Sequence, residues 1–136
     1  MQNQFIQTNQ IKLHVMTDGP ENGTPVILLH GFPEFHYGWR KQIPALVAAG
    51  FRVIAPDQRG YNLSDKHGPY DLLTLTQDIA DFQDALDIRQ SHVIAHDWGG
   101  IVGWTFCARY PERVMKHVSI NGPHPDAYLE TCRKHR

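Results

Sequence analysis

The chain has 136 residues, enough for one domain with a hydrophobic core of its own. Hydrophobic residues make up 41%, charged residues 20%, and the formal net charge is -1, so nothing indicates nucleic acid or a membrane surface as a partner. We expect neither a signal peptide nor a membrane-spanning segment. Two cysteines are too few for a disulfide framework, which favours a cytoplasmic location, and the nine histidines are scattered singly, so no metal site is expected.

Apolar runs in the chain predict the strands. The first two runs alternate at period 2 around Asn9 and Gln10, which predicts an antiparallel hairpin. The later runs are continuous, which is typical of strands buried on both faces of a parallel sheet. The strands expected from these runs are, in chain order, 5–8, 11–15, 25–29, 51–56, 91–95 and 115–120.

Helical patterns lie between the later strands. The first pattern contains Pro44, which starts a fresh turn, and ends at Gly50 as its cap. In the second, Thr74 and Gln77 have the spacing of a capping box. The expected helices are 38–49, 74–86, 98–110 and 126–136. A hairpin followed by alternating strands and helices predicts a single α/β domain over residues 1–136, with a mostly parallel sheet and helices on both faces.

Asp97 is the candidate nucleophile because it lies at the corner between a strand and a helix. Ala95 precedes it by two residues, and Gly99 and Gly100 follow it, so small residues flank a sharp turn. This is the layout of the nucleophile elbow G-x-S-x-G, with Asp in place of Ser. A plain helix N-cap is the alternative role for this residue, since Asp is favoured there too.

Four loops leave the carboxyl ends of the parallel strands, where α/β sheets bind ligands. Their sequences are HGFPE at 30–34, DQRGYNLSDK at 57–66, HDWG at 96–99 and NGPHP at 121–125. Together and in this order they resemble the soluble epoxide hydrolases of the α/β-hydrolase fold family. The resemblance implies the N-terminal half of that fold, with a core at 25–125 and the start of a lid at 126–136. It also implies that the family pattern continues past residue 136 with two lid tyrosines, a second acid and a water-activating histidine.

The resemblance implies a reaction in which Asp97 attacks a strained ring carbon and opens an epoxide to a vicinal diol through a covalent ester. A carboxylate has a reference pKa of about 4 and is ionised at neutral pH, so it needs no base. The backbone N–H groups of Phe32 and Trp98 would form the oxyanion hole, and Phe32, Trp98 and Glu34 would line the substrate pocket. The partners would be a small-molecule epoxide and water, with no cofactor.

Two other functions stay open. A haloalkane or haloacid dehalogenase would use the same Asp nucleophile, although Phe32 stands where haloalkane dehalogenases place Asn, and Trp98 where fluoroacetate-cleaving relatives place Arg. The chain could also be a non-catalytic fragment that works only with a complementary half. In that case strand 115–120 is an exposed edge, which favours self-association and marginal stability.

The remaining loop residues are expected to be structural. His30 should make hydrogen bonds within its loop. Asp57 and Arg59 should order the second loop as a pair.

Overall fold

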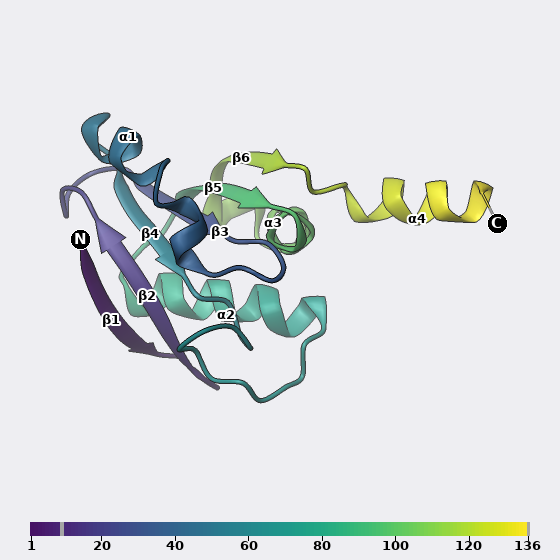
Figure 1. Ribbon diagram of the computed structural model, residues 1–136, viewed down its shortest axis with the longest axis horizontal. Coiled ribbons are helices and arrows are strands. Elements are labelled where there is room, and N and C mark those ends of the chain that lie inside the picture. The colour runs from purple at the N-terminus through teal and green to yellow at the C-terminus, as the bar shows by residue number, and fades with distance from the viewer. Residues whose placement is uncertain (9, 136) are drawn as a thin grey trace.

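The computed structural model, which describes residues 1–8 and 10–135, has a six-stranded sheet with helices on both faces (Figure 1). The strands are β1 (Gln2–Gln7), β2 (Lys12–Asp18), β3 (Pro25–Leu29), β4 (Arg52–Pro56), β5 (Ser91–His96) and β6 (Val114–Ile120). The α-helices are α1 (Ile43–Ala48), α2 (Leu72–Ala85), α3 (Trp98–Arg109) and α4 (Pro125–Lys134), with short 3-10 helices η1 (His36–Trp39) and η2 (Pro111–Arg113). The expected hairpin is present, but the turn prediction at Asn9 and the helix end at Arg136 lie outside the described residues.

The sheet has the order β1-β2-β4-β3-β5-β6. β1 and β2 are antiparallel to each other, β2 is antiparallel to β4, and the remaining pairs are parallel, as predicted. From the central strand β3 the chain passes to β4 on one side and afterwards to β5 on the other. This reversal brings the loops after β3, β4 and β5 together at the carboxyl edge of the sheet, which is where ligands bind in such folds.

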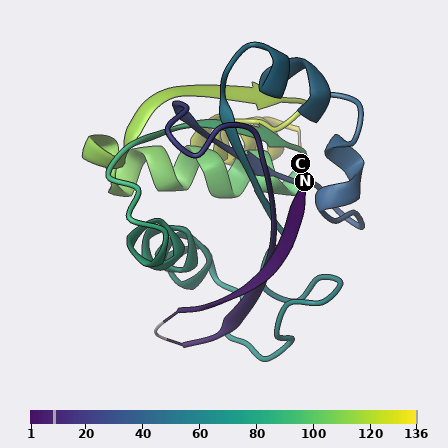
Figure 2. The ribbon, with the colours of Figure 1, turned by 90° about the vertical axis from the view of Figure 1, so that its left-hand side faces the viewer.

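The two faces of the sheet have separate hydrophobic cores. Alternation along a strand sends Leu28 and Leu29 to opposite faces, and both are fully buried. On the Leu29 face, Phe82 of α2 and Phe106 of α3 belong to the larger core. On the Leu28 face, Ile43 of α1 belongs to the smaller core. The two orientations show α1 on one side of the sheet and α2 and α3 on the other (Figures 1 and 2). Burial on both faces explains the continuous apolar runs in the sequence.

Two helix starts differ from the predictions. The expected capping box of Thr74 with Gln77 is wrong: Asp71 caps α2, and its carboxylate accepts a hydrogen bond from the Thr74 N–H at 3.0 Å. An acceptor three residues earlier in the chain fulfils the same need, so the helix begins at Leu72. The expected helix at 38–49 is divided into η1 and α1, with Pro44 in the first turn of α1. In the described ranges, no helix combines the length and the apolar character needed to cross a membrane.

β6 lies at an edge of the sheet, as expected. Within residues 1–8 and 10–135 it pairs with β5 alone, and Met115, Val118 and Ile120 are 43–50% exposed. α4 follows β6 and projects away from the sheet (Figure 1). The last strand therefore presents apolar side chains and one row of backbone groups that the described chain does not cover.

Candidate active site

Asp97 lies at a tight corner between β5 and α3, with φ 55° and ψ -121°. Positive φ is uncommon for residues other than glycine and is least unfavourable for Asn and Asp. The surroundings leave no room for larger neighbours: a Cβ atom on Gly31 would lie 2.6 Å from Asp97 Cβ, and one on Gly100 would lie 2.8 Å from Gly122 Cα. The small residues around this corner thus permit a strained backbone that aims the carboxylate out of the sheet.

The two oxygens of the Asp97 carboxylate are in different environments. Oδ2 accepts hydrogen bonds from the backbone N–H groups of Phe32 (3.0 Å) and Trp98 (2.6 Å). No donor in the described residues contacts Oδ1. The N–H group of Phe32, followed by that of Trp98, holds the pKa of Asp97 below its ordinary value, so the group is ionised at neutral pH. Asp97 is therefore both the N-cap of α3 and the residue at the elbow, and the two sequence interpretations are compatible.

Asp97 lines a cavity of about 450 Å³, which we call the Asp97 cavity. Two residues predicted for the pocket, Phe32 and Trp98, line it with Asp97. Sequence reasoning did not identify the other lining residues, which are Tyr61, Ile101, Asn121, Pro123 and Tyr128. The walls are mostly apolar or aromatic with few polar groups, which is typical of a small-molecule site.

Tyr61 and Asn121 could have been found from their places in the sequence. Tyr61 belongs to the loop after β4, and its ring packs edge-on against His30 with centroids 4.7 Å apart. Burial, and then the negative charge of Asp97, raise the pKa of the Tyr61 phenol, so its hydroxyl remains a hydrogen-bond donor. Asn121 directly follows β6 and has a φ of 49°. Both residues come from loops at the carboxyl edge of the sheet, which was the available signal.

Glu34 lines a different cavity, of about 260 Å³, with Trp39, Gln42 and His96 among its other walls. A Glu34 carboxylate oxygen lies 3.3 Å from His96 Nδ1. The structure thus brings Phe32, Asp97 and Trp98 together and places Glu34 next to the residue that precedes Asp97. Contact between Glu34 and a substrate stays a prediction.

Asp57 does not pair with Arg59, so that prediction is wrong. Asp57 is fully buried, and its carboxylate accepts four hydrogen bonds. Oδ2 accepts from His14 Nδ1 (2.7 Å) and Asn62 Nδ2 (2.8 Å), and Oδ1 accepts from the N–H (2.9 Å) and Nδ1 (2.8 Å) of His36. Burial alone would raise the pKa of Asp57, but these donors, the His36 N–H first, hold it below its ordinary value. The two histidine partners come from β2 and η1, too distant in sequence to be foreseen.

His14, His36 and Asp57 are also the group of described residues whose donor atoms could surround a metal ion, since these atoms lie within 4.8 Å of one another. The scattered spacing of the histidines had suggested no such group. However, a carboxylate only accepts hydrogen bonds, so both imidazole Nδ1 atoms must carry protons at these distances. The group is satisfied by its own hydrogen bonds and ties the loop after β3 to the loop after β4.

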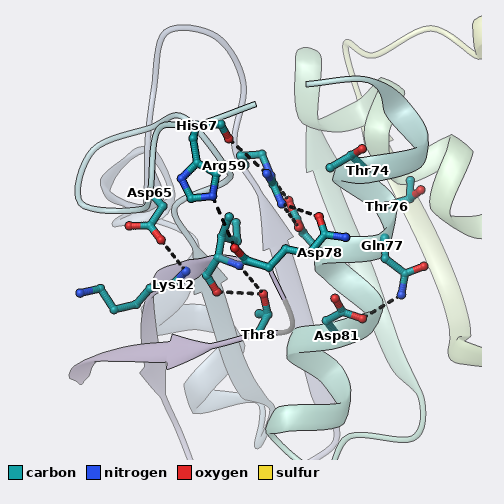
Figure 3. A network of polar contacts seen from close by, with 12 residues as sticks. Thr8, Lys12, Arg59, Asp65, His67, Thr74, Thr76, Gln77, Asp78 and Asp81 are labelled. Carbon is teal, nitrogen blue, oxygen red and sulfur yellow. Dashed lines mark hydrogen bonds and ion pairs between the residues drawn. The ribbon is translucent and has the colours of Figure 1, made fainter. Parts of the chain in front are cut away.

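Arg59 instead forms a bidentate ion pair with Asp78 of α2 (Figure 3). Nε and Nη2 each lie 2.7 Å from a carboxylate oxygen, and both side chains are buried. Nη1 donates to the His67 carbonyl at 3.1 Å. This arrangement fixes the loop after β4 to α2, because two parallel hydrogen bonds define the orientation of the guanidinium.

His30 makes the structural hydrogen bonds that were predicted. Its Nε2 accepts from the Gln58 N–H at 2.9 Å, so Nδ1 carries the proton and donates to the Gly31 carbonyl at 3.0 Å. Burial lowers the pKa of His30 and favours the neutral form. Both ring nitrogens are occupied, so this imidazole is not available as a base.

Comparison with known proteins agrees with the fold. The family model described as "alpha/beta hydrolase fold" matches residues 24–136. The chain belongs to the alpha/beta hydrolase fold family. Its relatives include an AB hydrolase superfamily protein, YfhM, of Bacillus subtilis, 52% identical over 125 residues, which are 90% of this chain and 44% of the relative. Epoxide hydrolase 1 of Caenorhabditis elegans is 40% identical over 91% of this chain and 31% of its own length.

Solved structures of family members have the same fold. A mutant epoxide hydrolase from Bacillus megaterium, complexed with its diol product, superposes with a TM-score of 0.91 at 38% identity. The match covers 98% of this chain and 47% of that one. The chain thus spans less than half of the length of these alpha/beta hydrolase relatives.

Proposed function

We propose that this chain carries the nucleophilic half of an epoxide hydrolase site, in which Asp97 opens an epoxide through a covalent ester. The observation that carries the proposal is the unequal use of the Asp97 carboxylate. Oδ2 is held by two N–H groups, Oδ1 has no described donor, and Asp97 lines a cavity. The epoxide hydrolases among the relatives support the choice of substrate class.

In the proposed first step, Oδ1 forms a bond to a ring carbon of the epoxide. The bond from that carbon to the ring oxygen breaks, and its electron pair remains on the oxygen, which takes a proton from an acid. Because the N–H groups of Phe32 and Trp98 already occupy Oδ2, Oδ1 is the oxygen that attacks.

In the second step, a base takes a proton from water while the water oxygen attacks the carbonyl carbon of the ester, and negative charge develops on Oδ2. The intermediate then collapses: the bond between Cγ and Oδ1 breaks, and the diol leaves with Oδ1, which takes the proton back from the base. The N–H groups of Phe32 and Trp98 already point at that oxygen, so they would stabilise the tetrahedral intermediate without moving. Loss of one such donor typically costs about 10²–10³-fold in rate. The same pair therefore serves both steps, first by keeping Asp97 ionised and then as the oxyanion hole.

We propose that the whole protein also supplies the acid, the water-activating base and most of a lid. The family resemblance places them beyond residue 136, and it makes residues 126–136 the beginning of a lid over the Asp97 cavity. The lining of that cavity by Tyr128 of α4 agrees with this assignment.

The test is the intact mass of the protein after brief exposure to a reactive aryl epoxide. We expect an added mass equal to that of the epoxide in the wild type and none in Asp97→Asn, which retains an N-cap residue tolerant of positive φ. A folded protein that forms no adduct with epoxides but forms one with an alkyl halide would favour the dehalogenase. A folded protein that reacts with neither would favour the non-catalytic fragment.

We also propose that β6 mediates self-association when nothing covers it. An edge strand that is paired on one side only, with exposed Val118 and Ile120, offers backbone groups and apolar area to a second strand. Val118→Lys should shift sedimentation toward the monomer, because a lysine on an edge strand opposes pairing. The same substitution at exposed Leu63, far from β6 in sequence, is the matched control. Equal association of all three proteins would contradict the proposal.

A cytoplasmic location stays a prediction from composition.

A further inference from the structure

The loop that carries the Phe32 N–H is fixed at its beginning by one residue of the neighbouring loop, Gln58. The Gln58 backbone N–H donates to His30 Nε2 at 2.9 Å, and its side-chain Nε2 donates to the His30 carbonyl at 2.7 Å. Gln58 and His30 are 7% and 1% exposed, so these contacts are shielded from water. A residue of the loop after β4 thus holds both the ring and the main chain of the first residue after β3.

The contact between Gln58 and His30 is two residues along the chain from Phe32, whose N–H donates to Asp97 Oδ2. Gly31 lies between His30 and Phe32 and fits closely against the elbow, because a Cβ atom on it would lie 2.6 Å from Asp97 Cβ. The Gly31 carbonyl accepts from His30 Nδ1 (3.0 Å) and from the Glu34 N–H (3.0 Å), which closes the turn containing Phe32. Displacement of the His30 carbonyl would therefore move the Phe32 N–H relative to Asp97 Oδ2.

We propose that Gln58 is a positioning residue for the nucleophile: by holding His30, it places the Phe32 N–H on Asp97 Oδ2. The consequence for catalysis rests on the proposed function, but the consequence for the Asp97 carboxylate does not. At the other end of the same loop, His36 makes two hydrogen bonds to Asp57. The contact that holds the beginning of the loop is therefore the one from Gln58.

The first test is an NMR titration of the Asp97 carboxyl in the wild type, Gln58→Met and Leu63→Ala. Methionine keeps the length of glutamine and removes the donor to the His30 carbonyl, whereas Leu63 is an exposed residue of the same loop. We expect the pKa of Asp97 to rise toward its ordinary value in Gln58→Met and to stay unchanged in Leu63→Ala. The other titratable groups facing Asp97 are His96 on β5, Tyr61 and, across the cavity, Tyr128 on α4, and all remain in both variants.

An unchanged pKa of Asp97 in folded Gln58→Met would overturn the proposal. A second measurement on the wild type covers the case in which that variant does not fold. Nitrogen chemical shifts of His30 at neutral pH should show a neutral ring with the proton on Nδ1. A proton on Nε2 would exclude the bond from the Gln58 N–H and would equally overturn the assignment.

The same proteins separate this inference from the proposed function. With an aryl epoxide, we expect the rate of adduct formation in Gln58→Met to fall by about tenfold, less than for the outright loss of an oxyanion donor. If the pKa of Asp97 shifts but the wild type forms no adduct, the positioning role stands and the epoxide reaction fails. If the wild type forms the adduct and Gln58→Met forms it as fast with an unshifted pKa, the positioning role fails alone.

Discussion

Asp57 and Asp97 follow β4 and β5, on either side of the central strand, yet their carboxylates are used in opposite ways. Asp57 is completely buried, and each of its oxygens accepts two hydrogen bonds. Asp97 is half-buried, and both of its bound donors are on Oδ2. Both carboxyls have a depressed pKa, so ionisation does not distinguish them. The difference is an uncommitted oxygen beside a cavity, which suits Asp97 for chemistry and Asp57 for holding loops.

The largest expected effect is the loss of reaction in Asp97→Asn with the fold retained. The amide is a poor nucleophile but still caps α3, so we expect no adduct and a change in unfolding free energy of about 1 kcal/mol or less. Mass spectrometry and urea unfolding measure the two quantities. A large loss of stability would mean that Asp97, like Asp57, serves mainly to hold the fold together.

Asp57→Asn should give the reverse pattern. One carboxylate oxygen becomes an NH₂ donor that faces other donors, so we expect a loss of about 1–3 kcal/mol in unfolding free energy. The nucleophile itself is unchanged, and adduct should still form in the folded fraction. An unfolding midpoint equal to that of the wild type would contradict the role given to the Asp57 cluster.

The comparison also predicts how stability depends on pH. A carboxyl with a depressed folded pKa contributes stability above its unfolded pKa of about 4, and this contribution is lost as pH falls through the folded pKa. The unfolding free energy of the wild type should therefore decrease below about pH 4. Asp57→Asn removes one such group, so its decrease should be shallower. Parallel curves from urea unfolding at several pH values would show that Asp57 does not contribute.

The smallest effect is expected from Asn62→Gly. Asn62 donates one hydrogen bond to Asp57 and has a φ of 46°, which glycine adopts without strain. The substitution thus removes a single donor, and a loss of about 1 kcal/mol is expected. The control is Asn22→Gly, at an exposed turn far from the cluster. Equal stability of the two variants would mean that Asn62 adds nothing to the cluster.

The parts of the molecule that follow from local patterns were predictable. Apolar runs located all six strands, and the sharp change from strand to helix located Asp97. The histidine partners of Asp57 and the carboxylate partner of Arg59 were not predictable, because His14 is 43 residues from Asp57 and Asp78 is 19 from Arg59. Nothing local distinguishes an arginine that pairs with its own loop from one that reaches a helix. Glu34 shows the same limit, since adjacency to HGF does not specify which of two cavities a side chain enters.

Tandem mass spectrometry of the peptides from the epoxide-treated wild-type protein tests most directly whether Asp97 is the nucleophile. We expect the added mass on Asp97, with Asp57 and Glu34 unmodified. An adduct on Asp57, Glu34 or a histidine, with Asp97 unmodified, would contradict the claim that the uncommitted oxygen of Asp97 is the nucleophile.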